Sequence, residues 1–170
     1  MLYTTERLTV REWTADPADV DRIFDIYSRW EVARWLGAAP KAMSTRDEAA
    51  SLVDRWHAFH VESGGRYGAW AIQAETKIAG TVLFKPLPGE SDEIEVGWHL
   101  HPDSWGNGYA TEAARGAIER GFASGLTEVF AVVYPGNTAS IAVCHRLGMT
   151  PLGRTSKWYG VELEAFRKVS

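Results

Sequence analysis

The chain lacks most of the features that mark secreted, membrane-spanning or metal-holding proteins. Among its 170 residues there is one cysteine, Cys144, so it has neither an internal disulfide framework nor a cysteine-based zinc site. No apolar run approaches the roughly 20 residues that cross a bilayer. The start, from Met1 to Glu6, lacks the basic and apolar segments of a signal peptide. These absences predict a cytoplasmic protein with no membrane partner.

Positive charge is also scarce. Lys and Arg total 18 against 22 Asp and Glu, the formal net charge is -4, and no basic cluster occurs. Nucleic acid is therefore not expected as a partner. The 5 histidines have no carboxylate or cysteine that completes a ligand set, so no metal site is predicted.

Apolar and aromatic residues, in contrast, are plentiful. Hydrophobic residues make up 45% of the chain, which suits one domain, 1–170, with a core of its own. The 8 tryptophans exceed what a core of this size needs, so some are expected to line a pocket or an interface. A homodimer is one expectation that follows.

Hydrophobic periodicity and capping residues predict an alternation of strands and helices. Strands are expected at 4–13, 67–73, 77–84, 93–100, 128–134, 149–155 and 161–169. Helices are expected from Asp16-Pro17 to Tyr27, at 32–35, and at 45–61, 108–123 and 138–147. The short loops between the three middle strands make those strands antiparallel neighbours. This order predicts an α/β (α+β) fold, a mixed and mainly antiparallel sheet flanked by helices.

The most informative segment is 98–113, where an extended run meets Gly106-x-Gly108-x-Ala110 at the mouth of a helix. Glycine N–H groups can converge on a phosphate there, and the positive end of the helix points at the same place. No lysine lies in the turn, so the backbone has to hold the anion. Taken alone, two such glycines are better explained as a strand-to-helix turn that needs positive φ; the segment that begins at Asn137 favours the phosphate site instead.

Three passages of the sequence resemble the GNAT superfamily of N-acetyltransferases, and more narrowly its RimJ/RimL-like branch of ribosomal-protein acetyltransferases. They are residues 5–11 with 31–37, residues 95–113 and residues 135–149, and they follow the order of the family along nearly the whole chain. The resemblance implies a sheet whose central strands, here 93–100 and 128–134, splay into a V-shaped cleft. The cleft would admit acetyl-CoA as the acetyl donor.

The resemblance also implies the residues that hold acetyl-CoA. The pyrophosphate would bind the amides of Gly106, Asn107, Gly108, Tyr109, Ala110 and Thr111. The pantetheine arm would pair with the backbone of Trp98, His99 and Leu100, and Asn137 would bond it from the opposite wall, beside Ser140. Trp105 stands where many relatives have a basic residue or glutamine, so one phosphate contact is lost or replaced by stacking.

Acetyl transfer to an amine needs a base and a proton for the departing thiolate. Glu95 is the candidate base, directly or through water, with a solvated strand carboxylate as an equal alternative, and His99 could share the task. Cys144 replaces a tyrosine that many GNAT enzymes use as the acid. In the RimL-like pattern the donor is the serine three residues after the asparagine, here Ser140; the alternative is a helix residue that bonds the backbone. Cys144 itself is expected to pack.

The acceptor pocket is expected from residues before 66 and from loops 86–92 and 156–160. Its candidates are Trp30, Trp35, Trp56, Trp158 and Tyr159, with Arg34 and the acidic residues Glu90, Asp92 and Glu93 to orient a charged acceptor. The expected reaction is direct acetyl transfer to a primary amine, possibly a protein or peptide N-terminal α-amine. The alternatives are an antibiotic, polyamine or amino acid acceptor, and a non-catalytic CoA-binding regulatory module. A Rossmann site is disfavoured because the third glycine is missing.

Overall fold

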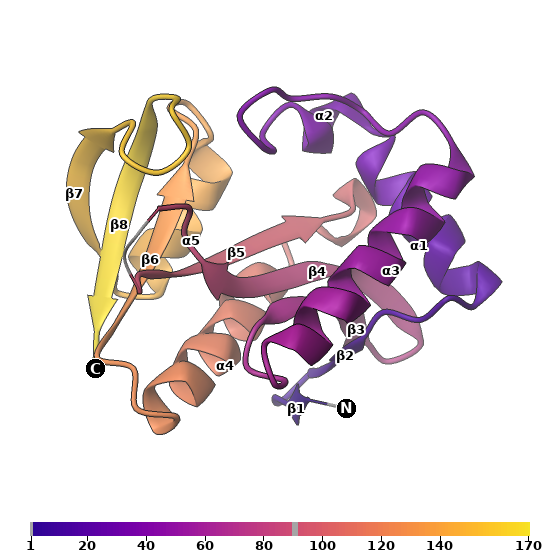
Figure 1. Cartoon of the computed structure of the whole chain (residues 1–170), viewed down its shortest axis with the longest axis horizontal. Coiled ribbons are helices and arrows are strands. Elements are labelled where there is room, and N and C mark those ends of the chain that lie inside the picture. Colours follow the sequence, from indigo (N-terminus) through magenta and orange to yellow (C-terminus); the bar gives the residue numbers. More distant parts are fainter. Residues whose placement is uncertain (1, 90–91) are drawn as a thin grey trace.

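The computed structural model describes residues 2–89 and 92–170. One sheet of eight strands, in the order β1-β2-β3-β4-β5-β6-β8-β7, carries helices on both faces (Figure 1). The strands are β1 (Tyr3–Thr4), β2 (Leu8–Glu12), β3 (Gly68–Ala74), β4 (Lys77–Pro86), β5 (Ile94–Leu100), β6 (Glu128–Val133), β7 (Thr150–Thr155) and β8 (Leu163–Val169). The helices are α1 (Pro17–Tyr27), α2 (Trp30–Ala33), α3 (Arg46–Glu62), α4 (Tyr109–Ala123) and α5 (Thr138–Arg146), with a 3-10 turn η1 (Pro102–Ser104). The predicted mixed α/β fold is confirmed.

Capping residues begin the helices where the sequence predicts them. Asp16 is the N-cap of α1, and Pro17 follows at the first position, where its missing N–H removes no helical bond. At α3 the side chain of Thr45 accepts a hydrogen bond from the backbone N–H of Glu48 at 3.3 Å. The described residues include no helix that is both long and apolar enough to cross a membrane.

The single strand expected over 4–13 is wrong, because the chain turns there. β1 and β2 form a hairpin in which the N–H of Thr5 donates to the carbonyl of Leu8 at 2.9 Å. The hydroxyl of Thr5 accepts the N–H of Leu8 in return, at 3.1 Å. A side chain that bonds nearby backbone competes with a continuous strand. The hairpin places the turn of residues 5–7 against the start of α4.

Each face of the sheet has its own apolar core. On one face, α4 and α5 pack on β2–β6 and β8, and α4 contributes the small residues Ala113, Ala114 and Ala117, which let it lie close to the sheet. On the other face, α1, α2 and α3 form a second cluster around Ile23 and Tyr27. The face of β5 that carries Glu95 and His99 turns toward this second layer, where the ring of His99 packs edge-on against Tyr27.

The sheet is continuous except between β5 and β6. β5 pairs with β4 from Ile94 to Leu100, but it meets the parallel strand β6 at a single pair, Glu95 with Phe130. Beyond this pair the two strands diverge, as Figure 1 shows. The predicted splay is therefore present, and it leaves the β6-facing edge of β5 without a partner strand.

Candidate active site

The loop between η1 and α4 presents a row of backbone N–H groups. Gly106 and Gly108 have φ of 76° and 79°, the left-handed region that glycine adopts at little cost. The N–H of Glu112 is the first to make a helical bond, to the carbonyl of Gly108 at 3.1 Å. In the part of the chain that the structure describes, no acceptor takes the amides of residues 106–111, and the hydroxyl of Thr111 is buried without a partner. Such a set of donors at a helix N-terminus fits a phosphate.

Side chains hold this loop in shape. The amide of Asn107 donates to the carbonyls of Ser104 and Trp105, at 3.2 and 3.0 Å. The indole N–H of Trp105 donates to the carbonyl of Leu100 at 2.9 Å, while its ring remains 51% exposed. Because the indole N–H is already engaged, it does not replace the phosphate contact that a basic residue would make; the exposed ring face is still available for stacking.

The register of β5 decides which of its backbone groups face the gap. The N–H of His101 bonds the carbonyl of Ala79 at 2.9 Å, and hydrogen-bonded pairs alternate along an antiparallel ladder. The backbone of His99 therefore also points to β4, and the expectation that it pairs with the arm is wrong. The N–H and C=O of Trp98 and the N–H of Leu100 point to the gap, where an extended ligand could add as a strand.

Glu95 lies where β5 and β6 part, and its side chain belongs to a three-residue cluster. The residue is 8% exposed, and its Oε2 accepts the hydroxyl of Tyr159 at 2.5 Å. Lys85, its cross-strand neighbour on β4, places Nζ 3.3 Å from the same oxygen and donates to the Tyr159 hydroxyl at 2.7 Å. Burial and the Glu95 carboxylate raise the pKa of Tyr159, so that its hydroxyl stays protonated as a donor.

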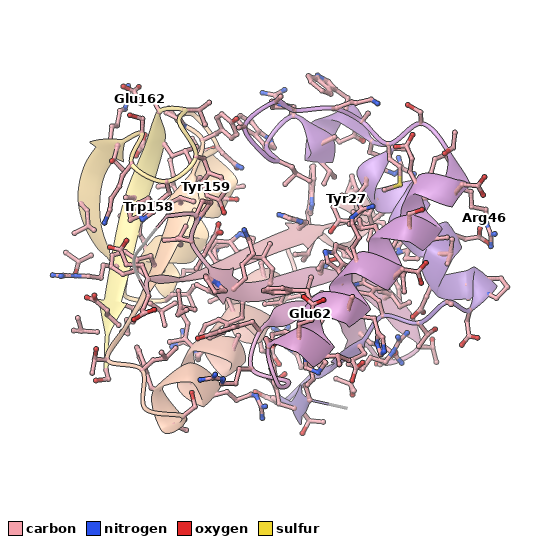
Figure 2. All side chains as sticks on the ribbon, in the orientation of Figure 1. Tyr27, Arg46, Glu62, Trp158, Tyr159 and Glu162 are labelled. Carbon is pink, nitrogen blue, oxygen red and sulfur yellow. The ribbon has the colours of Figure 1, made fainter. Side chains whose placement is uncertain are left out.

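Tyr159 belongs to the loop between β7 and β8, which crosses β6 to reach Glu95. Figure 2 shows Tyr159 on the β6–β8 side of the molecule and Tyr27 on the α1 side. Tyr159 is among the residues expected at the acceptor pocket, whereas Lys85 is a functional residue that the sequence pattern does not single out. The cross-strand pairing of Lys85 with Glu95 was the signal that could have found it.

His99 shares the face of Glu95 and is held from the α1 side. Its Nδ1 lies 3.1 Å from the hydroxyl of Tyr27, which donates to the hydroxyl of Thr81 at 2.9 Å. Burial, with a smaller effect of Lys85, lowers the pKa of His99 to about 4. The imidazole is therefore neutral near pH 7, and it adds a polar but uncharged group to the acceptor side.

The acidic rim expected for the acceptor is wrong at Glu93. Its carboxylate accepts hydrogen bonds from Lys157 Nζ and from the indole of Trp158, each at 2.8 Å. Glu93 thus ties the β7–β8 loop to β5 instead of offering an open charge. Asp92 is exposed, and Glu90 lies outside the described residues.

Trp56 and the Arg34–Trp35 pair, all expected at the acceptor pocket, lie in different parts of the molecule. Trp56 is partly buried and packs against the second core cluster, beside Tyr27. The loop after α2 does reach the cleft: the Tyr134 hydroxyl, just after β6, donates to the carbonyl of Gly37 at 2.6 Å. Beside it, the guanidinium of Arg34 lies over the ring of Trp35, 4.3 Å from the centroid.

Comparison with known proteins identifies the family. The family model of the acetyltransferase (GNAT) domain matches residues 7–150. This chain belongs to the GNAT acetyltransferase family. The uncharacterized N-acetyltransferase YoaA of Bacillus subtilis (strain 168) is 31% identical over 155 residues, which are 89% of this chain and 84% of that protein.

Two solved structures share the fold of this GNAT chain. The microcin C7 self immunity acetyltransferase MccE, in complex with acetyl-CoA and AMP, matches with a TM-score of 0.82 at 19% identity, covering 98% of this chain and 94% of MccE. RimL, the ribosomal L7/L12 alpha-N-protein acetyltransferase in complex with coenzyme A, matches with a TM-score of 0.81 at 15% identity, covering 99% and 97%. At these identities the likeness is one of fold.

The protein is accordingly a GNAT enzyme, an acetyl-CoA-dependent N-acyltransferase, and its residues fit that donor. The row of free amides and the unpartnered Thr111 hydroxyl suit a diphosphate. The unpaired edge of β5 suits an extended arm that carries amide groups.

In this GNAT enzyme α5 forms the wall opposite β5. Asn137 is its N-cap, and the side-chain oxygen accepts the backbone N–H of Ser140 at 3.2 Å. The hydroxyl of Ser140 makes no hydrogen bond with the described residues, so the backbone-bonded alternative for this side chain is not what the structure shows. Cys144, one turn further along, is 0% exposed.

Cys144 is expected to be unreactive. Burial raises the pKa of its thiol to about 12, so almost none of it is thiolate at pH 8. We expect the folded enzyme to resist iodoacetamide at pH 8, measured by intact mass, and the protein unfolded in urea to react fully. Rapid alkylation of the folded enzyme would contradict this, since it would show a thiol that is accessible and ionised.

Proposed function

We propose that Glu95 is the base and Ser140 the acid for acetyl transfer from acetyl-CoA to a primary amine, and that this amine is the α-amine of a protein or peptide N-terminus. Acetyl-CoA supplies an activated acetyl thioester. The residues of this chain have to hold it, accept a proton from the incoming amine and return one to the departing sulfur.

The position of Glu95 carries the proposal. It occupies the last point at which β5 and β6 touch, so it lies at the inner end of the gap and on the face of β5 that turns toward α1–α3. Its Oε2 is engaged by Tyr159 and Lys85, whereas Oε1 makes no hydrogen bond with the described residues. An amine, or a water between the amine and the carboxylate, can bond to Oε1.

The acid–base chemistry of the amine favours an α-amine as the acceptor. Tyr159 and Lys85 occupy Oε2 of Glu95, which leaves Oε1 to take the proton of the amine. A peptide α-amine has a reference pKa near about 8 and is roughly a tenth neutral at pH 7, while a lysine amine near about 10.4 is neutral in well under one molecule in a thousand. An α-amine therefore needs less help from a general base such as Glu95 than a lysine amine does. RimL is named for this chemistry, and the sequence motifs resemble its branch.

Ser140 is assigned the acid because its hydroxyl, on α5 across the gap from β5, makes no hydrogen bond with the described residues. Replacing it with alanine is expected to lower kcat about tenfold, less than the roughly 10²-fold or more usual for loss of a general acid, because a thiolate is already a good leaving group. The KM for acetyl-CoA should stay within a factor of about two, because the cofactor is held mainly by the amides of the loop. Thr138→Ala, at an exposed position two residues earlier, is the matched control. An unchanged kcat in Ser140→Ala would remove Ser140 from the chemistry.

An acceptor screen tests the proposed substrate class. Three sets are compared with acetyl-CoA: peptides with a free N-terminus, the same peptides with a blocked N-terminus and an internal lysine, and small amines such as polyamines and aminoglycosides. The expected result is a mass gain of one acetyl group on the free N-termini alone. Turnover confined to the small amines would assign the enzyme to a small-molecule acceptor instead.

A further inference from the structure

The loop that receives the diphosphate has no cation of its own. Neither lysine nor arginine occurs anywhere in residues 98–114. That stretch does contain Glu112, in the first turn of α4. An isolated carboxylate there would oppose an incoming anion, since it lies within a turn of the amides that bind it. A diphosphate therefore requires this charge to be compensated from elsewhere in the chain.

The compensating charge comes from the turn between β1 and β2. The Arg7 side chain binds Glu112 with Nε at 2.8 Å and Nη2 at 2.6 Å, and its backbone N–H donates to the other carboxylate oxygen at 2.9 Å. Its Nη1 donates to the carbonyl of Asn107, inside the loop, at 3.1 Å. A Cβ built on Gly108 would lie 3.4 Å from Nη2. A residue about 100 positions away thus contacts the phosphate loop directly.

We propose that Arg7 is the cation of the diphosphate site and acts through the loop without entering it. It cancels the charge of Glu112, and it binds the carbonyl of Asn107. In a trans peptide that carbonyl points away from the N–H of Gly108, so the guanidinium sits behind the peptide and the anion in front of it. A cation bound to the carbonyl of Asn107 polarises the peptide and strengthens the N–H of Gly108 as a hydrogen-bond donor. Arg7 is therefore a positioning residue for the diphosphate.

The test compares three probes that share the pantetheine arm: coenzyme A, 3′-dephospho-coenzyme A, which lacks the 3′-phosphate, and pantetheine, which lacks the diphosphate together with the adenosine. Their dissociation constants are measured by calorimetry, and by ligand-detected NMR for the weakest. Arg7→Gln is expected to weaken both phosphate-bearing probes about tenfold, in line with loss of one charge-assisted contact, and to leave pantetheine unchanged. Arg7→Lys keeps the charge, so its dissociation constants for both phosphate-bearing probes should stay within about threefold of those of the wild type.

The Glu112→Gln variant distinguishes an effect of charge on coenzyme A affinity from an effect of the shape of the loop. It removes the carboxylate and leaves the Arg7 cation in place, so coenzyme A should bind as tightly as in the wild type or more tightly. If the Arg7–Glu112 pair only shaped the loop, both variants would lose affinity by a similar factor. Because Arg7 is half exposed, the wild type should also lose coenzyme A affinity more steeply with added salt than Arg7→Gln does.

Arg46→Gln is the matched control. Arg46 is as exposed as Arg7, is also paired with an acid, Asp21, and begins α3 on the other side of the molecule (Figure 2). It should leave all three dissociation constants unchanged. The proposal is overturned if Arg7→Gln binds coenzyme A with the affinity of the wild type. It is also overturned if the variant loses affinity for pantetheine by the same factor as for coenzyme A, or if only coenzyme A, which carries the 3′-phosphate, binds more weakly. Should Arg7→Gln fail to fold, Arg7→Lys and Glu112→Gln decide instead: both should keep the affinity for coenzyme A, and a roughly tenfold loss in Glu112→Gln would overturn the proposal.

Discussion

Replacing Glu95 with glutamine is expected to lower kcat about 10²- to 10³-fold, within the range for loss of a positioned general base. Glutamine keeps the shape of the side chain and can still accept the Tyr159 hydroxyl bonded to Oε2, so the β7–β8 loop should stay in place. The KM for acetyl-CoA should change little, because the phosphate loop lies away from this face. Steady-state kinetics, with acetyl-CoA affinity measured separately, checks the role: the loss should fall on kcat while acetyl-CoA binds as in the wild type.

Glu93→Gln is the matched control for this prediction. Glu93 precedes Glu95 by two residues on the same face of β5, and its carboxylate is tied to Lys157 and Trp158. Its loss should loosen the loop and lower kcat by less than about threefold, as for most changes away from the reacting atoms. If Glu93→Gln and Glu95→Gln lowered kcat equally, Glu95 would be a support for the loop and the base would lie elsewhere.

Local chemistry explains which parts of this fold the sequence predicts. Pro17 and Thr45 mark the starts of helices because the fixed φ of proline and a side-chain cap each act over three or four residues. Alternation along 93–100 predicts that Glu95 and His99 share a face, because side chains alternate along any strand. The two glycines predict the phosphate loop, because positive φ is a property of the residue itself.

The contacts that tune the site are not local, and the sequence does not predict them. Tyr159 meets Glu95 across 64 positions, because β8 returns between β6 and β7 and directs the preceding loop over β6. Arg7 meets the phosphate loop only because the chain turns at Thr5. The backbone of His99 points to β4 because of a register that hydrogen bonding sets and periodicity does not reveal.

The wall that holds the pantetheine arm depends on a close approach between β4 and β5 at Gly80. A Cβ added there would lie 2.7 Å from Leu100 Cα and closer still to the carbonyl oxygen of His99. Both are backbone atoms, so neither can rotate away. Gly80→Ala is expected to lower the free energy of unfolding by about 3 kcal/mol, the upper part of the range for overpacking. The smaller gain from a stiffer unfolded chain, about 0.4–1 kcal/mol, does not offset it.

Gly97→Ala provides the contrast on the neighbouring strand. Its Cβ would meet Leu83 at 3.0 Å, but those are side-chain atoms of a partly buried leucine that can change rotamer. Gly97→Ala should therefore lower the free energy of unfolding by less than about 1 kcal/mol. Urea unfolding of both variants measures the difference, with an unchanged m-value showing that the unfolded state is the same. A large loss of stability in Gly80→Ala alone would show that close contact between the backbones of β4 and β5 at Gly80 holds Trp98 and Leu100 at the edge of the gap. If the two variants were equally stable and Gly80→Ala still bound coenzyme A, the position of that edge would not depend on this approach.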